Sequence, residues 1–239
     1  MIKDSIIKVR ERIIFVCSKV KRDPDEICIV AVSKNRPVEQ IKEAIEAGLD
    51  NIGENRVQEA VVKYNELSAP AIKWHLLGHL QTNKAKEAVK IFDLIHSVDS
   101  LHLAEIIDKE AAKINKIQDI LLEVKVSPEL TKFGLSPEDV PEVIKEISEF
   151  KNIRIKGLMA IAPIVGNPEQ ARPYFRRLRE LFNKINELSA IDRPEGRGLA
   201  SDSQSHYQLS ALSMGMTDDF EVAVEEGSNM VRLGRAIFE

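Results

Sequence analysis

One lysine near the start of the chain stands where an apolar segment ends. Residues 27–32 read ICIVAV without a polar side chain, and Ser33 and Lys34 follow directly. The ammonium group of a partly desolvated lysine has a lowered pKa, and the neutral amine can attack a carbonyl carbon to form a Schiff base. The other interpretation is a solvated charge whose aliphatic stem lies over apolar surface. Which interpretation holds for Lys34 therefore depends on where the elements around it place its side chain.

Two segments near the C-terminus could hold the phosphate group of a ligand. ALSMGMTDDF at 211–220 supplies Ser213 and Thr217, and NMVRLGRAIF at 229–238 places Gly234 before a short helical turn. Backbone N–H groups and helix N-termini attract phosphate, and glycine allows its close approach. A lysine that faces two such segments indicates a phosphorylated carbonyl compound held at both ends.

Apolar segments of strand length alternate along the chain with longer segments whose apolar residues recur every three or four positions. This alternation is typical of repeated βα units. We expect a leading helix near 3–20, helices that include 38–48 and 136–150, and eight strands at 27–33, 51–55, 73–78, 94–98, 120–126, 155–161, 208–214 and 229–234. These elements predict an α/β fold, a single (β/α)8 TIM barrel over residues 1–239 with an extra N-terminal helix. A doubly wound open sheet is the alternative, but no GxGxxG turn follows the first strand.

A barrel would bring the candidate residues to one end. Barrel enzymes place their chemistry at the C-terminal ends of the strands, and the loops after strands seven and eight frequently hold phosphate. Lys34 and both C-terminal segments would then share that face. The polar segment 189–208 connects a helix to the next strand, so we expect it on the opposite face and assign it no catalytic role.

Composition and charge exclude several classes of protein. The net charge of −4 and the mixed signs of the charged residues offer no surface for nucleic acid. No run approaches about 18 apolar residues, and the charged N-terminal segment lacks the apolar core of a secretory signal. Cys17 and Cys28 have neither the CxxC spacing of a metal site nor the number that a disulfide scaffold needs. We expect a cytoplasmic protein without membrane or nucleic-acid partners.

Several sequence blocks resemble a known family. They are AVSKNRP (31–37), IGENRVQE (52–59), WHLLGHLQTNK (74–84), HSVD (96–99), GLMAIAP (157–163), LSMGMTDDFEVAVEEG (212–227) and MVRLGRAIF (230–238). Together they extend over nearly the whole chain and are similar to the YggS/PROSC family of pyridoxal 5′-phosphate (PLP) homeostasis proteins. The resemblance implies the PLP-binding barrel that also forms the N-terminal domain of alanine racemase.

The resemblance also implies which residues bind the cofactor. By position, Lys34 matches the lysine that forms a Schiff base with PLP, and Asn55 in the GEN block lies beside the cofactor. Four positions match the phosphate site, namely Ser213, Thr217, Gly234 and the backbone N–H of Arg235. Arg232 matches the arginine near the pyridine nitrogen. A permanent cation there would keep that nitrogen unprotonated and weaken the ring as an electron sink.

Some of these positions have a plainer interpretation. Arg232 could be an exterior arginine in a surface ion pair, and Asn55 could be a turn residue or a helix cap. Lys132 matches a position where family members often carry a basic residue, so it either takes part in PLP exchange or is a solvated loop lysine. Arg235 stands where threonine is frequent, which leaves its backbone N–H and its charge for a phosphate.

His75 and His79 have the spacing of two metal ligands on one helix. Leu76 stands where the HExxH motif needs a glutamate, and the apolar residues before Gly78 favour a strand. We therefore expect no metal site here.

Two classes of function follow from the resemblance. The first is a non-catalytic protein that holds PLP as a Schiff base and buffers it or delivers it to PLP-dependent apoenzymes. The second is a PLP enzyme, above all an amino-acid racemase, which needs a second acid or base opposite the lysine. In related racemases a tyrosine from an additional β domain supplies that group, and Tyr64, Tyr174 and Tyr207 are no evident substitutes.

A Schiff-base aldolase without a cofactor is a third interpretation. It fits Lys34 less well, because such lysines usually lie on a later strand of the barrel. We favour the PLP-binding protein, acting as a monomer and without catalytic residues.

Overall fold

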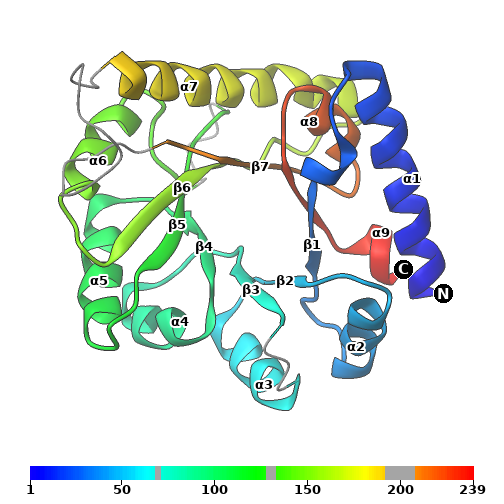
Figure 1. The fold of residues 1–239 in the computed structure, drawn as a ribbon, viewed down its shortest axis with the longest axis horizontal. Coiled ribbons are helices and arrows are strands. Elements are labelled where there is room, and N and C mark those ends of the chain that lie inside the picture. Colours follow the sequence, from blue (N-terminus) through cyan, green and yellow to red (C-terminus); the bar gives the residue numbers. More distant parts are fainter. Residues whose placement is uncertain (68–70, 128–132, 192–207) are drawn as a thin grey trace, which may run out of the picture.

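The computed structural model describes residues 1–67, 71–127, 133–191 and 208–239. In this part of the chain, eight parallel strands pair in sequence order and close into a barrel, with β1 hydrogen-bonded to both β2 and β8 (Figure 1). The strands are β1 (Cys28–Val32), β2 (Asn51–Glu54), β3 (Lys73–Leu76), β4 (Leu94–Val98), β5 (Gln118–Glu123), β6 (Ile153–Met159), β7 (Ala211–Met216) and β8 (Met230–Leu233). The predicted (β/α)8 barrel is confirmed, and the open sheet is wrong.

The helices form a layer outside the barrel (Figure 1). They are α1 (Ile2–Val20), α2 (Val38–Glu46), α3 (Val57–Leu67), α4 (Ala85–Ile91), α5 (Leu101–Ala112), α6 (Val140–Ile147), α7 (Arg172–Ile191), α8 (Phe220–Glu225) and α9 (Arg235–Phe238), with short 3₁₀ turns η1 (Pro24–Glu26), η2 (Thr82–Lys84) and η3 (Pro168–Ala171). The predicted extra helix is α1, which lies beside α8 and α9 (Figure 1). Its buried residues Ile6, Val9 and Ile13 recur at helical spacing and face the molecule. None of the described helices could span a bilayer, since the long helices α1 and α7 carry charges along their length.

Two element boundaries differ from the sequence prediction for local reasons. The strand expected at 208–214 is found at Ala211–Met216, because the side chain of Asn186 on α7 binds both the N–H and the carbonyl of Leu209. Helix α6 begins at Val140 and not at 136, because Pro141 needs no hydrogen-bond acceptor and is therefore favoured in the first helical turn.

Apolar side chains pack on both sides of the sheet. The larger cluster fills the space between the barrel and the helices and includes Phe92 and Phe175. A smaller cluster fills part of the barrel interior and consists of Leu94, Leu121, Met159 and Ala211. Because side chains alternate along a strand, residues two positions further on also face the interior, among them His96, Glu123 and Ser213. The interior therefore carries an apolar layer and, nearer the C-terminal end, a polar one.

Candidate functional site

Lys34 lies at the C-terminal end of the barrel, in the turn that follows β1. The turn is closed by a hydrogen bond from the backbone N–H of Arg36 to the carbonyl oxygen of Ser33 (3.0 Å), and Asn35 adopts a left-handed conformation with a φ of 58°. The Lys34 side chain is exposed. Its place at the barrel mouth agrees with the prediction. The expected partial desolvation is not found, because β1 ends at Val32 and the turn carries the lysine into solvent.

A buried group of charged residues, which we call the Lys63 cluster, holds this turn. It consists of Lys63 and Glu59 on α3, Glu54 at the end of β2, and Ser33. The Lys63 ammonium donates to the carbonyl oxygen of Ser33 (2.6 Å), to Glu54 Oε1 (2.6 Å) and to Glu59 Oε1 (2.8 Å). The Ser33 hydroxyl donates to the same Glu54 oxygen (2.5 Å). Burial raises the pKa of Glu54, and the hydrogen bonds from Lys63 and Ser33 oppose that rise.

Sequence reasoning missed the Lys63 cluster, although one signal was present. The buried positions of α3 are Val57, Ala60 and Lys63, so a lysine occupies the apolar face of this helix. Glu59 precedes it by four residues, which is the spacing of an ion pair on a helix. A charge on a buried face requires a buried partner, and Glu54 in the GEN block was the available one.

The loops after β7 and β8 meet next to the Lys34 turn. The backbone N–H of Ala236 donates to Thr217 Oγ1 (3.3 Å), which joins the two loops. In the pairing of β1 with β8, Ala31 lies opposite Leu233, and a Cβ atom on Gly234 would lie 3.5 Å from the carbonyl oxygen of Val32. Thr217, Gly234 and the Lys34 turn are therefore brought together at one end of the barrel.

The side chain of Arg235 points to a neighbour on this surface. Its guanidinium forms an ion pair with Asp218, and both side chains are mostly exposed. The charge that the sequence offered to a phosphate is therefore shared with a carboxylate. The backbone N–H of Arg235, the other group that the sequence offered to a phosphate, lies at the start of α9.

Arg232 lies inside the barrel. Its side chain is 5% exposed, Nη1 donates to Ser213 Oγ (2.7 Å) and Nη2 donates to the carbonyl oxygen of Ala160 (2.9 Å). The interpretation as an exterior arginine in a surface ion pair is wrong. Burial lowers the pKa of Arg232 to about 10, against the opposing charges of Asp219 and Glu123, so the guanidinium stays charged at neutral pH.

Hydrogen bonds continue from Arg232 across the barrel through what we call the histidine network. It consists of Asn51, His75, His96, Ser213 and Arg232. The contacts run from Ser213 Oγ to His96 Nδ1 (3.1 Å), from His96 Nε2 to His75 Nδ1 (2.9 Å), and from His75 Nε2 to Asn51 Oδ1 (2.9 Å). Burial lowers the pKa of His75 to about 4 and that of His96 well below its usual value, so both imidazoles are neutral at pH 7.

The chemistry of the groups fixes the direction of these bonds. Asn51 Oδ1 can only accept, because the Asn51 amide nitrogen donates to Asp50 Oδ1 (2.6 Å). A neutral His75 then carries its proton on Nε2 and accepts at Nδ1 from His96 Nε2–H. The bare Nδ1 of His96 accepts from the Ser213 hydroxyl, which accepts from Arg232. The direction is thus set from Arg232 toward Asn51, and every member of the network is paired.

This arrangement changes the interpretation of Ser213. The sequence placed it with Thr217 in a phosphate site, but it lies within β7, is fully buried and has its hydroxyl bonded to His96 and Arg232. Its position within the strand was predicted, but its partners His96 and Arg232 lie on other strands and could not be. Ser213 therefore orients Arg232, and its side chain is not brought together with Thr217.

The remaining predicted residues lie as follows. Asn55 follows β2 at the barrel mouth, where its backbone packs so closely that a Cβ atom on Gly78 would lie 2.2 Å from its carbonyl oxygen. His79 is paired with Asp99 (3.2 Å), while His75 belongs to the histidine network. Among the described residues, no group of three His, Cys, Asp or Glu side chains could hold a metal ion. Lys132 and most of the segment 189–208 lie outside the described residues.

Glu123 is a second titratable group that sequence reasoning missed. It ends β5, it is 9% exposed, and it lies near enough to Arg232 and Asp99 for their charges to act on it. Burial raises the pKa of Glu123 to about 7, the Asp99 charge adds to the rise, and the Arg232 charge opposes it. The barrel mouth therefore holds a carboxyl group that exchanges its proton near neutral pH. Its sequence neighbours give no sign of this, because the cause lies on other strands.

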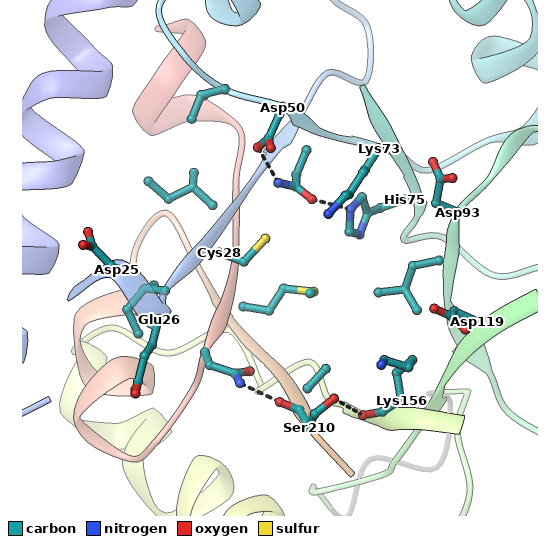
Figure 2. A pocket seen from close by; sticks show the side chains of 18 of the residues that line it. Asp25, Glu26, Cys28, Asp50, Lys73, His75, Asp93, Asp119, Lys156 and Ser210 are labelled. Carbon is teal, nitrogen blue, oxygen red and sulfur yellow. Dashed lines mark hydrogen bonds between the residues drawn. The ribbon is translucent and has the colours of Figure 1, made fainter. Parts of the chain in front are cut away.

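A cavity of about 830 Å³ opens at the opposite, N-terminal end of the barrel. Asp50, Lys73 and His75 line one part of it, and Asp119 and Lys156 line another (Figure 2). The bonds that link Asp50 to His75 through Asn51 are visible in this view. Barrel chemistry gathers at the C-terminal ends of the strands, so we place the candidate site at the Lys34 mouth and not in this cavity.

Comparison with known proteins gives one consistent picture. The sequence model of the alanine racemase N-terminal domain matches residues 18–239. A protein of Aquifex aeolicus named pyridoxal phosphate homeostasis protein is 40% identical over 235 residues, which are 98% of this chain and 96% of that protein. A protein of the same name from Pseudomonas aeruginosa is 35% identical over 237 residues, which are 99% of this chain and 94% of that protein.

Solved structures agree with the sequence relatives. PipY of Synechococcus elongatus, described as a COG0325 family member, is 34% identical, and the match covers 100% of both chains. Its TM-score to this chain is 0.85 in the structure without PLP and 0.84 in the structure with PLP bound.

Proposed function

We propose a function for this chain from the premise that it belongs to the alanine racemase N-terminal domain family and is a relative of the pyridoxal phosphate homeostasis proteins. The protein binds PLP at the C-terminal mouth of the barrel and serves PLP homeostasis. The observation that carries this proposal is the meeting of the exposed Lys34 turn with the joined loops after β7 and β8.

The groups at this mouth fit the chemistry of PLP. The Thr217 hydroxyl and the backbone N–H groups of Gly234 and Arg235 are donors suited to the phosphate. Lys34 offers the amine that would hold the cofactor as a Schiff base. When bound, PLP supplies a reactive aldehyde and an electron-withdrawing ring. Asn55, at the end of β2, completes the residues that we assign to the cofactor.

Arg232 has a separate role in the proposal. It is a buried cation that stays charged at neutral pH, and we place its guanidinium beside the pyridine nitrogen. A permanent cation there keeps the nitrogen unprotonated, which disfavours carbanion chemistry. Ser213 acts on the cofactor only by holding Arg232. The site therefore suits a protein that holds PLP and releases it to PLP-dependent apoenzymes, without turnover, as a cytoplasmic monomer.

Borohydride trapping tests the binding site. The protein is incubated with PLP, reduced with borohydride and mapped by peptide mass spectrometry, beside Lys34→Ala and the control Lys42→Ala, which removes an exposed lysine of α2. We expect the adduct on Lys34 in the wild type and in Lys42→Ala, and its loss in Lys34→Ala with the fold intact. An adduct that maps to another lysine, or that persists in Lys34→Ala, overturns the assignment.

One observation favours a second candidate function, a PLP-dependent racemase. Glu123 has a pKa of about 7 and lies near Arg232 at the mouth, so it could exchange a proton with a bound amino acid. Deuterium exchange from solvent into the Cα position of added amino acids separates the two functions. The holding function predicts no exchange above a trace. Sustained exchange that is lost in both Lys34→Ala and Glu123→Gln would establish the enzyme.

A further inference from the structure

The residues on either side of Lys34 are both held by the Lys63 cluster. The carbonyl oxygen of Ser33, one residue before Lys34, accepts from Lys63 Nζ (2.6 Å). The backbone N–H of Asn35, one residue after it, donates to Glu59 Oε1 (2.6 Å). Since Lys63 also donates to that Glu59 oxygen (2.8 Å), the two attachments are parts of one cluster.

We propose that Lys63 and Glu59 are positioning residues for Lys34, which fix the backbone of its turn so that the exposed amine is presented to PLP in one orientation. The proposal rests on the proposed function. It concerns two residues of α3 that lie outside the assigned cofactor contacts.

The first attachment is rigid because the Lys63 ammonium is buried and all three of its N–H donors are paired. The Lys63 residue is 6% exposed and Glu54 is fully buried. The ammonium has three N–H donors and three acceptors, one of which is the Ser33 carbonyl. A charged donor that is saturated in this way has no alternative partner, so the Ser33 carbonyl cannot turn away without leaving one N–H unpaired.

The second attachment holds a conformation that the chain would otherwise leave. Asn35 has a positive φ of 58°, a left-handed conformation that asparagine adopts more readily than most residues other than glycine, but at a higher free energy than its ordinary conformations. Burial alone would raise the pKa of Glu59, but hydrogen bonds from Lys63 and from the Asn35 N–H outweigh it and hold the pKa below its ordinary value. Glu59 is therefore a charged acceptor at neutral pH, which gives the stronger kind of hydrogen bond to the strained residue.

Lys34 therefore has an exposed side chain, while the backbone on either side of it is fixed at Ser33 and Asn35. An amine that must meet a carbonyl carbon in one orientation gains when that orientation is set before the ligand arrives. Without the attachments the turn would have to be ordered during binding, and both the rate of adduct formation and the affinity would fall.

The test compares variants that remove one attachment each. Glu59→Ala removes the acceptor of the Asn35 N–H, whereas Glu59→Gln keeps an oxygen at that place and serves as the rescue. Glu54→Leu combined with Lys63→Met removes the attachment of Ser33 and replaces the buried ion pair by apolar side chains, a change that usually spares the fold. Asp119→Ala is the control, since it removes a carboxylate about as exposed as that of Glu59 (24% against 25%) and breaks its ion pair with Arg154 (2.6 Å) at the other end of the barrel.

Two measurements are made on each variant. The first is the rate at which the borohydride-trapped PLP adduct forms on Lys34. We expect Glu59→Ala and the double variant to form it about tenfold more slowly, the loss expected for one charge-assisted hydrogen bond, and Asp119→Ala to stay within about twofold of the wild type. Glu59→Gln keeps a neutral acceptor, so its rate should lie between those of Glu59→Ala and the wild type. The second is amide hydrogen exchange at Asn35 without PLP, which should be about tenfold faster in Glu59→Ala and between that rate and the wild-type rate in Glu59→Gln.

The outcomes separate this proposal from the proposed function. If Glu59→Ala and the double variant form the Lys34 adduct at the wild-type rate, the positioning role is overturned while PLP binding stands. If the wild type itself forms no adduct on Lys34, the proposed function fails, and with it the role of the turn in PLP binding. The Asn35 exchange then still decides whether Glu59 holds the turn, and equal exchange in the wild type and Glu59→Ala would show that it does not.

Discussion

The Lys63 cluster and the histidine network both bury polar side chains near the barrel mouth, but they lie on opposite sides of the sheet. Glu54 is two residues after Ile52, whose side chain packs between the sheet and the helices, so the Lys63 cluster lies in that outer layer. The histidine network lies inside the barrel and joins β2, β3, β4, β7 and β8. The first buries an ion pair, whereas the second buries neutral side chains that end in one cation.

The two groups differ in charge because the outer layer receives side chains from helices and strands, whereas the barrel interior receives them from strands alone. A lysine on a helix can pack its apolar stem in the outer layer and bring its charge to the sheet, where Glu54 and Glu59 neutralise it. The barrel interior admits only strand side chains, and neutral imidazoles link neighbouring strands without adding charge. The Lys63 cluster is destabilised when one of its charged partners is lost, whereas the histidine network is destabilised when one of its neutral imidazoles is protonated. Each of the four predictions below uses this contrast.

The largest effect is expected from the loss of one buried charge. Lys63→Met leaves Glu54 buried without its cation, which should lower the free energy of unfolding by about 3–5 kcal/mol. Removing both charges, in Glu54→Leu with Lys63→Met, should recover most of this loss because no unpaired charge is left. Urea denaturation of both variants at pH 7 measures the difference. A single variant that loses under about 1 kcal/mol would mean that the pair is not buried as described.

The next effect is acid lability of the histidine network. The folded pKa of His75 is about 4, below its unfolded value of 6.5, so the unfolded state binds more protons between these values. Stability is therefore complete above pH 6.5 and falls as the pH drops toward 4, by on the order of 3 kcal/mol from His75 alone. The lowered pKa of His96 adds to the loss.

The contribution of Glu123 to the free energy of unfolding has the opposite pH dependence, so Glu123 must be replaced for this measurement. Burial also raises the pKa of Glu54, so we would follow denaturation from pH 7 to pH 5 in a background that carries Glu123→Gln together with Glu54→Leu and Lys63→Met. Stability that stays constant or rises as the pH falls would contradict neutral histidines in the interior.

Glu123 itself gives the third prediction. Its folded pKa is about 7 against an ordinary value of 4.5, so the folded state holds a proton that the unfolded state has lost between these values. Its contribution therefore favours folding less as the pH rises from 4.5 to 7. Glu123→Gln should stabilise the protein at pH 8 by on the order of 3 kcal/mol and change little at pH 4.5. Thermal denaturation at both pH values checks this, and an equal shift at the two values would refute the raised pKa.

The smallest effect is expected at an exposed pair that serves as the reference for both networks. Arg235 and Asp218 are 60% and 74% exposed, so their ion pair is screened by water. Arg235→Ala should change the free energy of unfolding by less than about 1 kcal/mol. PLP binding should be nearly unchanged, because the proposal uses the backbone N–H of Arg235. A tenfold loss of affinity would show instead that the guanidinium contacts the phosphate.

The sequence predicted the barrel well because its signals are local. Each strand and helix has its own apolar period and its own turn residues, and the alternation of the two leaves few architectures. The position of Lys34 at the barrel mouth could be predicted for the same reason, since the strand before it and the turn after it are adjacent in the chain. The main change, at Ser213, came from His96 and Arg232, which bind its hydroxyl from other strands.

The missed residues depend on contacts that are far apart in the chain. His96 and Ser213 are 117 positions apart, and Arg232 acts on Glu123 from another strand. Their burial and charge state are properties of the closed barrel, which no short segment contains. Lys63 is the exception, because its place on the apolar face of α3 could have been recognised from the sequence.

The single direction of the histidine network also makes its members change together. To run the other way, the Asn51 amide would have to turn over while both imidazoles moved their protons to the other nitrogen. Ser213 would then accept from His96 and from Arg232, and its own hydrogen would have no acceptor among the members of the network. An unpaired buried hydroxyl costs on the order of 1–3 kcal/mol, and the turned amide would also set Asn51 Oδ1 against Asp50 Oδ1, so the reversed direction is disfavoured by more than about fivefold. The hydrogen bonds that join the N-terminal cavity to Arg232 are therefore held in one direction, and no single member can reverse its bonds without all the others.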